Sequence, residues 1–393
     1  MKSLKLCAKC TLPETYETIE FDSQGICNIC HQQEYKQGNI DWKERRNQFD
    51  QLIAKHRGKY DYDCIVPFSG GKDSTYTLCF LVKEYKLKPL VIRFDHGFFR
   101  PKLEEYANKT FRSLGVDVLK FTPNWKVVKK LMLESLIRKG DFCWHCHTGI
   151  YSYPMHIAIK FKVPLILWGE PSAEYTAYYD YKEKNIEMVD EERFNRFINL
   201  GLNAEDMLGM ITSLEDPVDP RDLIPYTYPK MSELRKIGCH STCLGSYIPW
   251  NVKENVLYFQ KYLPWWKGDE VEGMPSDLYP YEKIECFMQG IRDYIKYIKR
   301  GYGRVSQMST LDIRHGRMTR EDALLLIRNY EGKKPRTLPI FLDYLGLTED
   351  QFNEIVFKTA IPPYEHDFQK HNELTPPLKD LDRFYREKGG IPE

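Results

Sequence analysis

The sequence predicts an α/β protein with a doubly wound parallel sheet, a zinc-ribbon-like module before the sheet and a mainly helical region after it. Three observations support this fold class. Residues 62–85 have the pattern of a strand, a glycine-containing loop and a helix, and strands and helices keep alternating further along the chain. Two CxxC pairs precede the first strand, and helical patterns dominate beyond residue 247.

The N-terminal cysteines form two pairs, Cys7 with Cys10 and Cys27 with Cys30. The spacer between the pairs is typical of zinc ribbons, and four thiolates at these spacings can close a tetrahedral site. We expect a strand and a turn between the pairs, with the strand at residues 19–22. A structural Zn²⁺ is the prediction; buried free thiols and an iron–sulfur cluster are the alternatives.

The stretch PFSGGKDST at residues 67–75 joins the first strand to a helix. Its glycines let the backbone approach an anion, the helix start offers unpaired N–H groups, and Lys72 adds positive charge. The loop therefore predicts a phosphate site, although its spacing is not that of a Walker loop. An ordinary glycine turn is the alternative. Before this stretch, residues 41–56 have the pattern of an amphipathic helix.

Further strands and helices follow the loop. Ligands of doubly wound sheets lie at the carboxyl ends of the strands. Asp95 and His96 follow the second strand, and Gly169 and Glu170 follow a later one, so we expect them at the rim of a nucleotide crevice. Turn-capping and helix-capping roles are the alternatives. The strands and helices that carry this argument are expected at residues 89–94, 102–114, 116–121, 143–162 and 163–168.

A third CxxC pair, Cys143 and Cys146, opens the helix that runs to about residue 162. A CxxC at a helix start lowers thiol pKa and suits metal or redox chemistry. Cys239 and Cys243 lie downstream and offer further ligands. A metal site and a cluster of free packing thiols are both consistent with this pattern.

Composition limits the class of protein. A chain of 393 residues calls for two or three domains, and we place them at 1–40, 41–246 and 247–393. The formal net charge of +1 argues against a broad non-specific grip on nucleic acid. No stretch is apolar enough for a signal peptide or a membrane span, so we expect a cytoplasmic protein.

The region after the sheet offers candidates for the acceptor side of the site. Residues 190–237 are helical and charged, and we interpret them as an insertion that builds this side. Four arginines further on are candidates to receive phosphates, with a solvated charged face as the alternative. We expect the tail beyond residue 360 to be loosely packed. The four arginines are Arg300, Arg304, Arg314 and Arg317.

The sequence SGGKDS resembles the SGGxDS signature of the ATP pyrophosphatase (PP-loop) superfamily, whose members cleave ATP between the α- and β-phosphates. The resemblance implies that Asp73 helps to place Mg²⁺. In tRNA-thiolating members, a CxxC at a similar place and one distant cysteine carry an iron–sulfur cluster, so Cys143 and Cys146 with Cys239 or Cys243 are candidates for one. The residues implied to hold the pyrophosphate end of ATP are Ser69, Gly70, Gly71, Lys72, Asp73 and Ser74.

Several motifs together are similar to the N-acetyl sugar amidotransferases, which make acetamidino sugars for lipopolysaccharide O-antigen or for flagellin glycans. In such an enzyme ATP adenylates the acetamido oxygen of a nucleotide-linked N-acetyl sugar, and ammonia then displaces AMP. The resemblance implies catalytic roles for Lys72, Asp73 and Glu170. The motifs are TIEFD at 18–22, GICNIC at 25–30, WGE at 168–170, YIPWN at 247–251 and DIRHGRMT at 312–319.

The source of ammonia and two rival functions complete the expectations. We find no glutaminase motif, so ammonia is expected from separate subunits that resemble the glutaminase and cyclase subunits of imidazole glycerol phosphate synthase. One rival is a PP-loop sulfurtransferase that thiolates tRNA or a metabolite. The other is a zinc-ribbon scaffold that binds ATP without turning it over.

Overall fold

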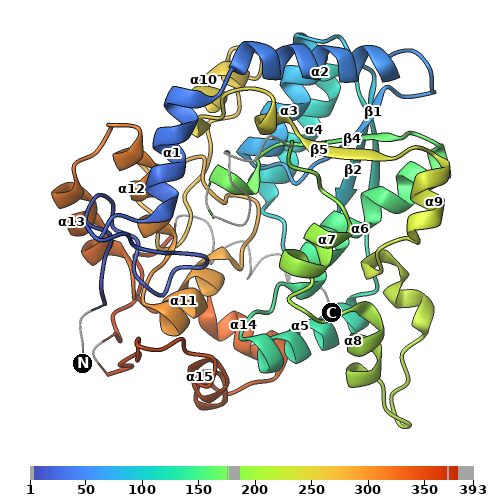
Figure 1. Cartoon of the computed structure of the whole chain (residues 1–393). Helices are drawn as coiled ribbons and strands as arrows, with labels where there is room; N and C mark the ends of the chain where they lie inside the picture. The colour runs from blue at the N-terminus through green and yellow to red at the C-terminus, as the bar shows by residue number, and fades with distance from the viewer. Residues whose placement is uncertain (1–3, 175, 177–185, 370, 379–393) are drawn as a thin grey trace.

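The computed structural model describes residues 4–174, 176, 186–369 and 371–378. Its centre is a parallel five-stranded sheet in the order β3-β2-β1-β4-β5 (Figure 1). The order reverses beside β1, because β2 pairs with one edge of β1 and β4 with the other. This arrangement confirms the predicted doubly wound class and puts a ligand crevice beside β1. The strands are β1 (Cys64–Pro67), β2 (Pro89–Phe94), β3 (Asp117–Phe121), β4 (Leu165–Trp168) and β5 (His240–Cys243).

Helices cover both faces of the sheet, and neighbouring residues of β1 belong to different faces. Val66 packs in the core formed by α3 (Lys72–Lys83) and α4 (Pro101–Leu114). Ile65 packs in the opposite core, with α6 (Trp144–Phe161) and α9 (Met231–Lys236). Both faces of β1 are therefore buried, in keeping with its continuous apolar run.

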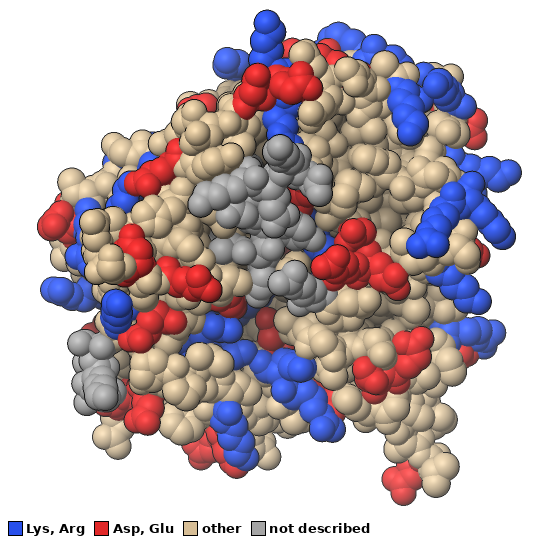
Figure 2. All heavy atoms as spheres, in the orientation of Figure 1, with Lys and Arg blue, Asp and Glu red and all other residues tan. Residues whose placement is uncertain are grey.

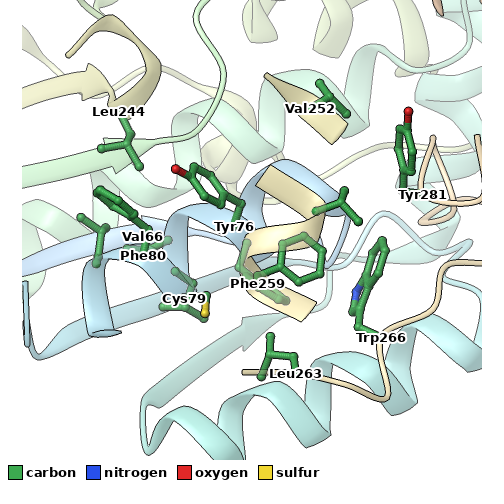
Figure 3. Packing of buried hydrophobic residues seen from close by; sticks show 14 of the residues in the cluster. Val66, Tyr76, Cys79, Phe80, Leu244, Val252, Phe259, Leu263, Trp266 and Tyr281 are labelled. Carbon is green, nitrogen blue, oxygen red and sulfur yellow. The ribbon is translucent and has the colours of Figure 1, made fainter. Parts of the chain in front are cut away.

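The C-terminal region joins the core through α10 (Val252–Gln260), which packs against α3. Figure 3 shows Phe259 of α10 and Tyr76 of α3 in one cluster with Trp266. A second core lies between α5 (Trp125–Lys139), α11 (Gln289–Arg300), α14 (Leu338–Leu345) and α15 (Glu349–Phe357). The C-terminal region is mainly helical, as predicted.

The remaining elements lie around these cores (Figure 1). Two helices follow the N-terminal cysteines, several short ones fill the predicted insertion, and two more precede α14. They are α1 (Asn28–Asn39), α2 (Trp42–His56), η1 (Ser172–Glu174), α7 (Glu191–Arg193), η2 (Phe194–Ile198), α8 (Ala204–Ile211), η3 (Pro220–Tyr226), η4 (Leu244–Ser246), α12 (Arg304–Arg314) and α13 (Arg320–Tyr330).

One expectation about local structure is wrong. The strand expected at residues 19–22 is reduced to an isolated antiparallel bridge between Phe21 and Cys27, because a turn already begins at Asp22, whose Oδ1 accepts from Gln24 N and Ile26 N. The tail beyond residue 360 is mostly exposed or half-buried as far as residue 378, as expected. Thr375 is an exception, since it is only 3% exposed and donates a hydrogen bond to Glu272 Oε1 at 2.7 Å.

The surface carries both signs of charge. On the face shown in Figure 2, acidic and basic side chains are interspersed, in line with the net charge of +1. No helix among the described residues is both long and apolar enough to cross a membrane.

Candidate functional site

The phosphate loop lies where β1 ends, at the reversal of strand order. Gly70 has φ +92°, which an L side chain rarely adopts, and a Cβ there would meet Leu103 at 3.1 Å. The helix α3 starts at Lys72, and among the described residues no side chain caps its N-terminus. The positive end of the α3 dipole therefore faces the crevice without a capping acceptor.

Two serines shape this loop. Gly70 N donates to Ser74 Oγ at 3.1 Å, and Gly71 N donates to Ser69 Oγ at 3.3 Å. The two hydroxyl oxygens are 3.3 Å apart. The predicted loop residues are thus brought together in one compact turn.

The loop lysine is held by two carboxylates. Lys72 Nζ lies 2.7 Å from Asp73 Oδ2 and 2.9 Å from Glu282 Oε2. Glu282 is 0% exposed and also pairs with Arg304 Nη2 at 2.7 Å. Burial alone would raise the pKa of Glu282, but Arg304 and Lys72 outweigh it and lower this pKa to about 2. Sequence reasoning missed Glu282, which lies far along the chain in no recognisable motif.

A cavity of about 190 Å³ opens beside the loop, at the carboxyl ends of β1, β2 and β4. His96 lines it, and burial lowers the pKa of its imidazole to about 3. Asp95 is not among the lining residues; it accepts from Gly97 N at 2.9 Å and pairs with Lys120. The lining includes Ser69, Asp73, Ser74, Phe94, Phe99, Tyr151, Trp168, Gly169 and Glu170.

Gly169 sets the distance between β4 and the loop. A Cβ at this position would lie 2.8 Å from Thr77 Oγ1 and 3.1 Å from the backbone oxygen of Asp73. Only glycine lets the backbone after β4 approach the first turn of α3 this closely. The next residue, Glu170, is consequently held beside Asp73 at the cavity wall.

A second, smaller cavity lies on the other side of Glu170. Its free volume is about 10 Å³, and Glu170 lines it as well as the first cavity. Four other residues come from the motifs YIPWN and DIRHGRMT, which lie far apart in the sequence. They are Trp250, Asp312, His315 and Arg317, and the remaining lining residues are Glu174, Val252, Tyr281, Met308 and Leu311.

The four candidate arginines have different partners. Arg317 pairs with Asp312 at 2.8 Å, Arg304 with Glu282, and Arg300 with Glu17 at 3.5 Å. Arg314 is 9% exposed and lies against the N-terminal cysteines. The solvated charged face, considered as an alternative, is therefore wrong for Arg314.

The N-terminal cysteines form a preassembled metal site. The Sγ atoms of Cys7, Cys10, Cys27 and Cys30 lie within 4.8 Å of one another, and all four are buried. Four sulfurs about 2.3 Å from a zinc ion would stand about 3.8 Å apart. The separation between Cys10 Sγ and Cys27 Sγ is 3.8 Å. The donor set and its spacing fit Zn²⁺.

The third CxxC pair packs in the same core as Cys286, which the sequence analysis did not consider as a ligand. Cys143 lies in the core around α5 and α11, and Cys146 and Cys286 pack against that core. Cys239 and Cys243 instead belong to the core on the α6 face of the sheet. The prediction that Cys239 or Cys243 completes a metal site with Cys143 and Cys146 is therefore wrong, because β5 places Cys243 at the edge of the sheet, in a different core.

Cys286 also connects these thiols with the cavity beside the loop. Its backbone forms an isolated antiparallel bridge with Phe99, which lines that cavity. Burial raises the pKa of the Cys143 thiol, and the nearby Cys146 and Cys286 raise it further. Among the described residues, they do not gather within 4.8 Å as the N-terminal four do.

Comparison with known proteins identifies one part of the chain. Residues 258–379 match the family described as LPS biosynthesis protein WbpG-like, C-terminal domain. An uncharacterized protein of Methanocaldococcus jannaschii, MJ1599, is 24% identical over 212 residues, which cover 51% of this chain and 74% of that protein.

Two solved structures show weak likeness. The U34-tRNA thiolase NcsA from Methanococcus maripaludis with its [4Fe-4S] cluster shares 14% identity, covers 84% of this chain and 90% of its own, and has a TM-score of 0.29. A predicted tRNA methyltransferase subunit from Methanocaldococcus jannaschii shares 17% identity, covers 48% of this chain and 93% of its own, and has a TM-score of 0.23. We draw nothing from these two at such TM-scores.

The region that matches the LPS biosynthesis family contributes directly to the site. It supplies Glu282 to Lys72 of the phosphate loop, and Asp312 and Arg317 to the smaller cavity. It also supplies Cys286 to the second cysteine cluster. The site is thus assembled from the sheet and from a region of LPS-biosynthesis type.

Proposed function

We propose that this protein is an ATP-dependent, AMP-forming amidotransferase that converts the acetamido group of a nucleotide-linked N-acetyl sugar into an acetamidino group. One observation carries the proposal: Glu170 lines both the cavity beside the loop and the smaller cavity, to which the region that matches LPS biosynthesis proteins contributes. A nucleotide and an acceptor bound on the two sides would meet at this carboxylate.

In the first step the acetamido oxygen attacks the α-phosphorus of ATP, and pyrophosphate leaves. The backbone N–H groups at the start of α3 and the charge of Lys72 stabilise the negative charge on the departing phosphates. Ser69, Gly70, Gly71 and Ser74 position the pyrophosphate. His96 and Gly169 line the cavity that would hold the nucleotide, whereas Asp95 accepts from Gly97 N and closes the turn that contains His96.

Asp73 is the proposed residue for Mg²⁺. Its Oδ1 is buried and has no hydrogen-bond partner among the described residues, although a buried carboxylate oxygen normally has one. Oxygen ligands from one or two carboxylates together with substrate phosphates are typical of magnesium sites. The ion would supply positive charge at the phosphates when bound.

In the second step ammonia attacks the carbon of the adenylated group, and AMP leaves with the former acetamido oxygen. Glu170 lies at the boundary between the cavities, where its carboxylate can accept hydrogen bonds from ammonia and orient the nitrogen. Ammonia would come from separate glutaminase- and cyclase-like subunits. The product would enter O-antigen or flagellin glycan synthesis in the cytoplasm.

The N-terminal zinc would have a structural role. All four coordination positions are taken by buried thiolates, which leaves no position for a substrate. The module instead supports the C-terminal wall of the site, because Arg320 Nε donates to the backbone oxygen of Cys10 at 3.0 Å.

An iron–sulfur cluster is the second metal centre of the proposal, with Cys143, Cys146 and Cys286 as its ligands. Soft thiolates select such clusters, and several iron atoms between the sulfurs suit thiols that stand farther apart than in a zinc site. A cluster with three protein ligands would supply a Lewis-acidic position, and neither reaction step above uses it. The same centre would serve the rival sulfurtransferase.

The decisive experiment is product analysis with Mg-ATP, ammonium and a panel of nucleotide-linked N-acetyl sugars. We expect AMP and pyrophosphate with one sugar, and a sugar product whose mass reflects replacement of O by NH. Asp73→Ala should abolish both. AMP formed only with tRNA and a sulfur donor would favour the sulfurtransferase, and no turnover with any acceptor would favour an ATP-binding scaffold.

A further inference from the structure

The smaller cavity beside Glu170 is lined by polar groups to which the proposed reaction assigns no role. Two of its lining side chains carry buried polar groups without partners. Among the described residues, Nε1 of Trp250 and the hydroxyl of Tyr281 have no hydrogen-bond partner. The residues are only 2% and 6% exposed. A buried donor without a partner costs about 1–3 kcal/mol, so both are poised for a ligand.

One part of the wall is apolar. Val252, Met308 and Leu311 line the same cavity. Figure 3 shows Val252 and Tyr281 at the edge of the packed cluster, with the hydroxyl of Tyr281 pointing away from the other side chains. The present free volume of about 10 Å³ is enough for one water molecule, so a larger group can enter only if the lining side chains move apart.

Acidic side chains that line the cavity form ion pairs with nearby lysines and with Arg317. Glu174 pairs with Lys36, and Asp312 pairs with both Lys253 at 2.9 Å and Arg317 at 2.8 Å. Burial and the nearby Arg317 lower the pKa of His315 to about 4, so its ring is neutral near pH 7. Three carboxylates, Glu170, Glu174 and Asp312, line the cavity against one arginine, so it suits a neutral polar group better than a phosphate.

We propose that this cavity widens to receive the acetamido group of the acceptor sugar, with its methyl against Val252, Met308 and Leu311. This assignment rests on the proposed function. An acetamido group has one N–H donor, one carbonyl acceptor and a methyl group. The cavity offers the complement: a carboxylate at Glu170, donors at Trp250 and Tyr281, and an apolar wall.

The arrangement also favours the first chemical step. A carbonyl oxygen has two lone pairs. When Trp250 or Tyr281 binds one of them, the other remains available for the α-phosphorus in the adjoining cavity, which Glu170 also lines. Trp250 and Tyr281 are therefore positioning residues for the acceptor, and they select sugars with an acetamido group.

The test is saturation-transfer NMR with UDP-N-acetylglucosamine as the probe and UDP-glucose as the matched control that lacks the acetamido group. We expect the strongest saturation at the acetyl methyl. Trp250→Phe and Tyr281→Phe keep the rings and remove one donor each, and should weaken probe binding roughly two- to tenfold. UDP-glucose binding should not change in either variant.

Trp265→Phe is the control variant, because Trp265 Nε1 is also buried without a partner among the described residues but lines neither cavity. Any of three outcomes would overturn the inference. They are equal saturation of the sugar-ring and acetyl protons, no saturation of either UDP-linked or CMP-linked probes, and unchanged probe binding in Trp250→Phe and Tyr281→Phe.

The outcomes separate this inference from the proposed function. Acetyl saturation that depends on Trp250, without AMP formation from any sugar, would retain the acetamido subsite and remove the amidotransferase. Sugar-dependent AMP formation that is equally fast in wild type, Trp250→Phe and Tyr281→Phe would retain the amidotransferase and remove the subsite.

Discussion

The guanidinium of Arg314 lies against the N-terminal cysteine site, with Nη2 3.9 Å from Cys10 Sγ. A zinc ion bound by four thiolates carries net negative charge, and Arg314, which belongs to the DIRHGRMT motif, is a buried counterion for it. Since His315 and Arg317 follow on the same segment and line the smaller cavity, one short segment contacts both the cysteine site and this cavity.

Arg314→Met should destabilise the protein by about 3 kcal/mol, because it leaves the buried thiolate site without its counterion. Chemical denaturation measures the change. Arg328→Met replaces an exposed arginine on α13 and should stay within about 0.5 kcal/mol of wild type. Equal stability of the two variants would mean that Arg314 does not compensate the charge of the metal site.

Zinc analysis of the purified protein should give one ion per chain. Cys27→Ser removes one of four ligands from the closed site and should lose the ion, since a structural zinc site is tetrahedral and needs all four. Cys239→Ala should retain it. Zinc bound equally by Cys27→Ser would place the ion elsewhere.

Glu282→Gln should reduce the loss of stability in acid. The pKa of Glu282 is lowered from 4.5 to about 2, so its ion pairs contribute fully above about pH 4.5 and are lost as pH falls towards 2. This shift corresponds to about 3 kcal/mol. Unfolding free energies measured between pH 7 and pH 2 should fall less steeply for the variant. Parallel curves would contradict the assignment of these ion pairs.

Cys286→Ala should abolish iron binding and visible absorbance in protein purified without oxygen, because it removes the third ligand of the proposed cluster. Cys239→Ala and Cys243→Ala should leave both signals unchanged, since these residues lie on another face of the sheet. If Cys239→Ala or Cys243→Ala lost the iron and Cys286→Ala kept it, the ligands would be those expected from the sequence. If the wild-type protein is colourless and free of iron, no cluster is bound, and Cys143, Cys146 and Cys286 are free thiols that pack in the core.

Gly169→Ala should destabilise the protein by about 1–3 kcal/mol, because its Cβ would come within 2.8 Å of Thr77 Oγ1. Gly209→Ala is a matched control in α8, where an added Cβ meets nothing within 4 Å. It should stabilise the helix by about 0.5–1 kcal/mol. Thermal unfolding of the two variants measures both effects, and a neutral Gly169→Ala would show that β4 does not need this close approach.

Local features were predictable from the sequence. The phosphate loop could be found because strand, glycines and helix start are consecutive, so the signal lies within one short segment. The N-terminal cysteine site was predictable for the same reason, since the spacing of its two pairs fixes the geometry. The helical pattern of α5, with Val128, Leu131 and Met132 buried, was present in the sequence but not interpreted.

Contacts between distant segments were not predictable. Glu282 reaches Lys72, and Cys286 reaches Cys143, only because the C-terminal region folds back over the phosphate loop. Strand β5 has the sequence HSTC, which lacks an apolar run, and its place is set by pairing with β4. No single-sequence pattern indicates which distant cysteine or carboxylate will arrive at a given place.

The ion pair between Lys72 and Glu282 has a consequence for synthesis of the chain on the ribosome. The strand and loop around Lys72 emerge long before Glu282 is translated, although the folded loop relies on that carboxylate to place its lysine. A nascent chain therefore holds the loop well before it holds Glu282, and the ion pair between Lys72 and Glu282 can form only after residue 282 has left the ribosome.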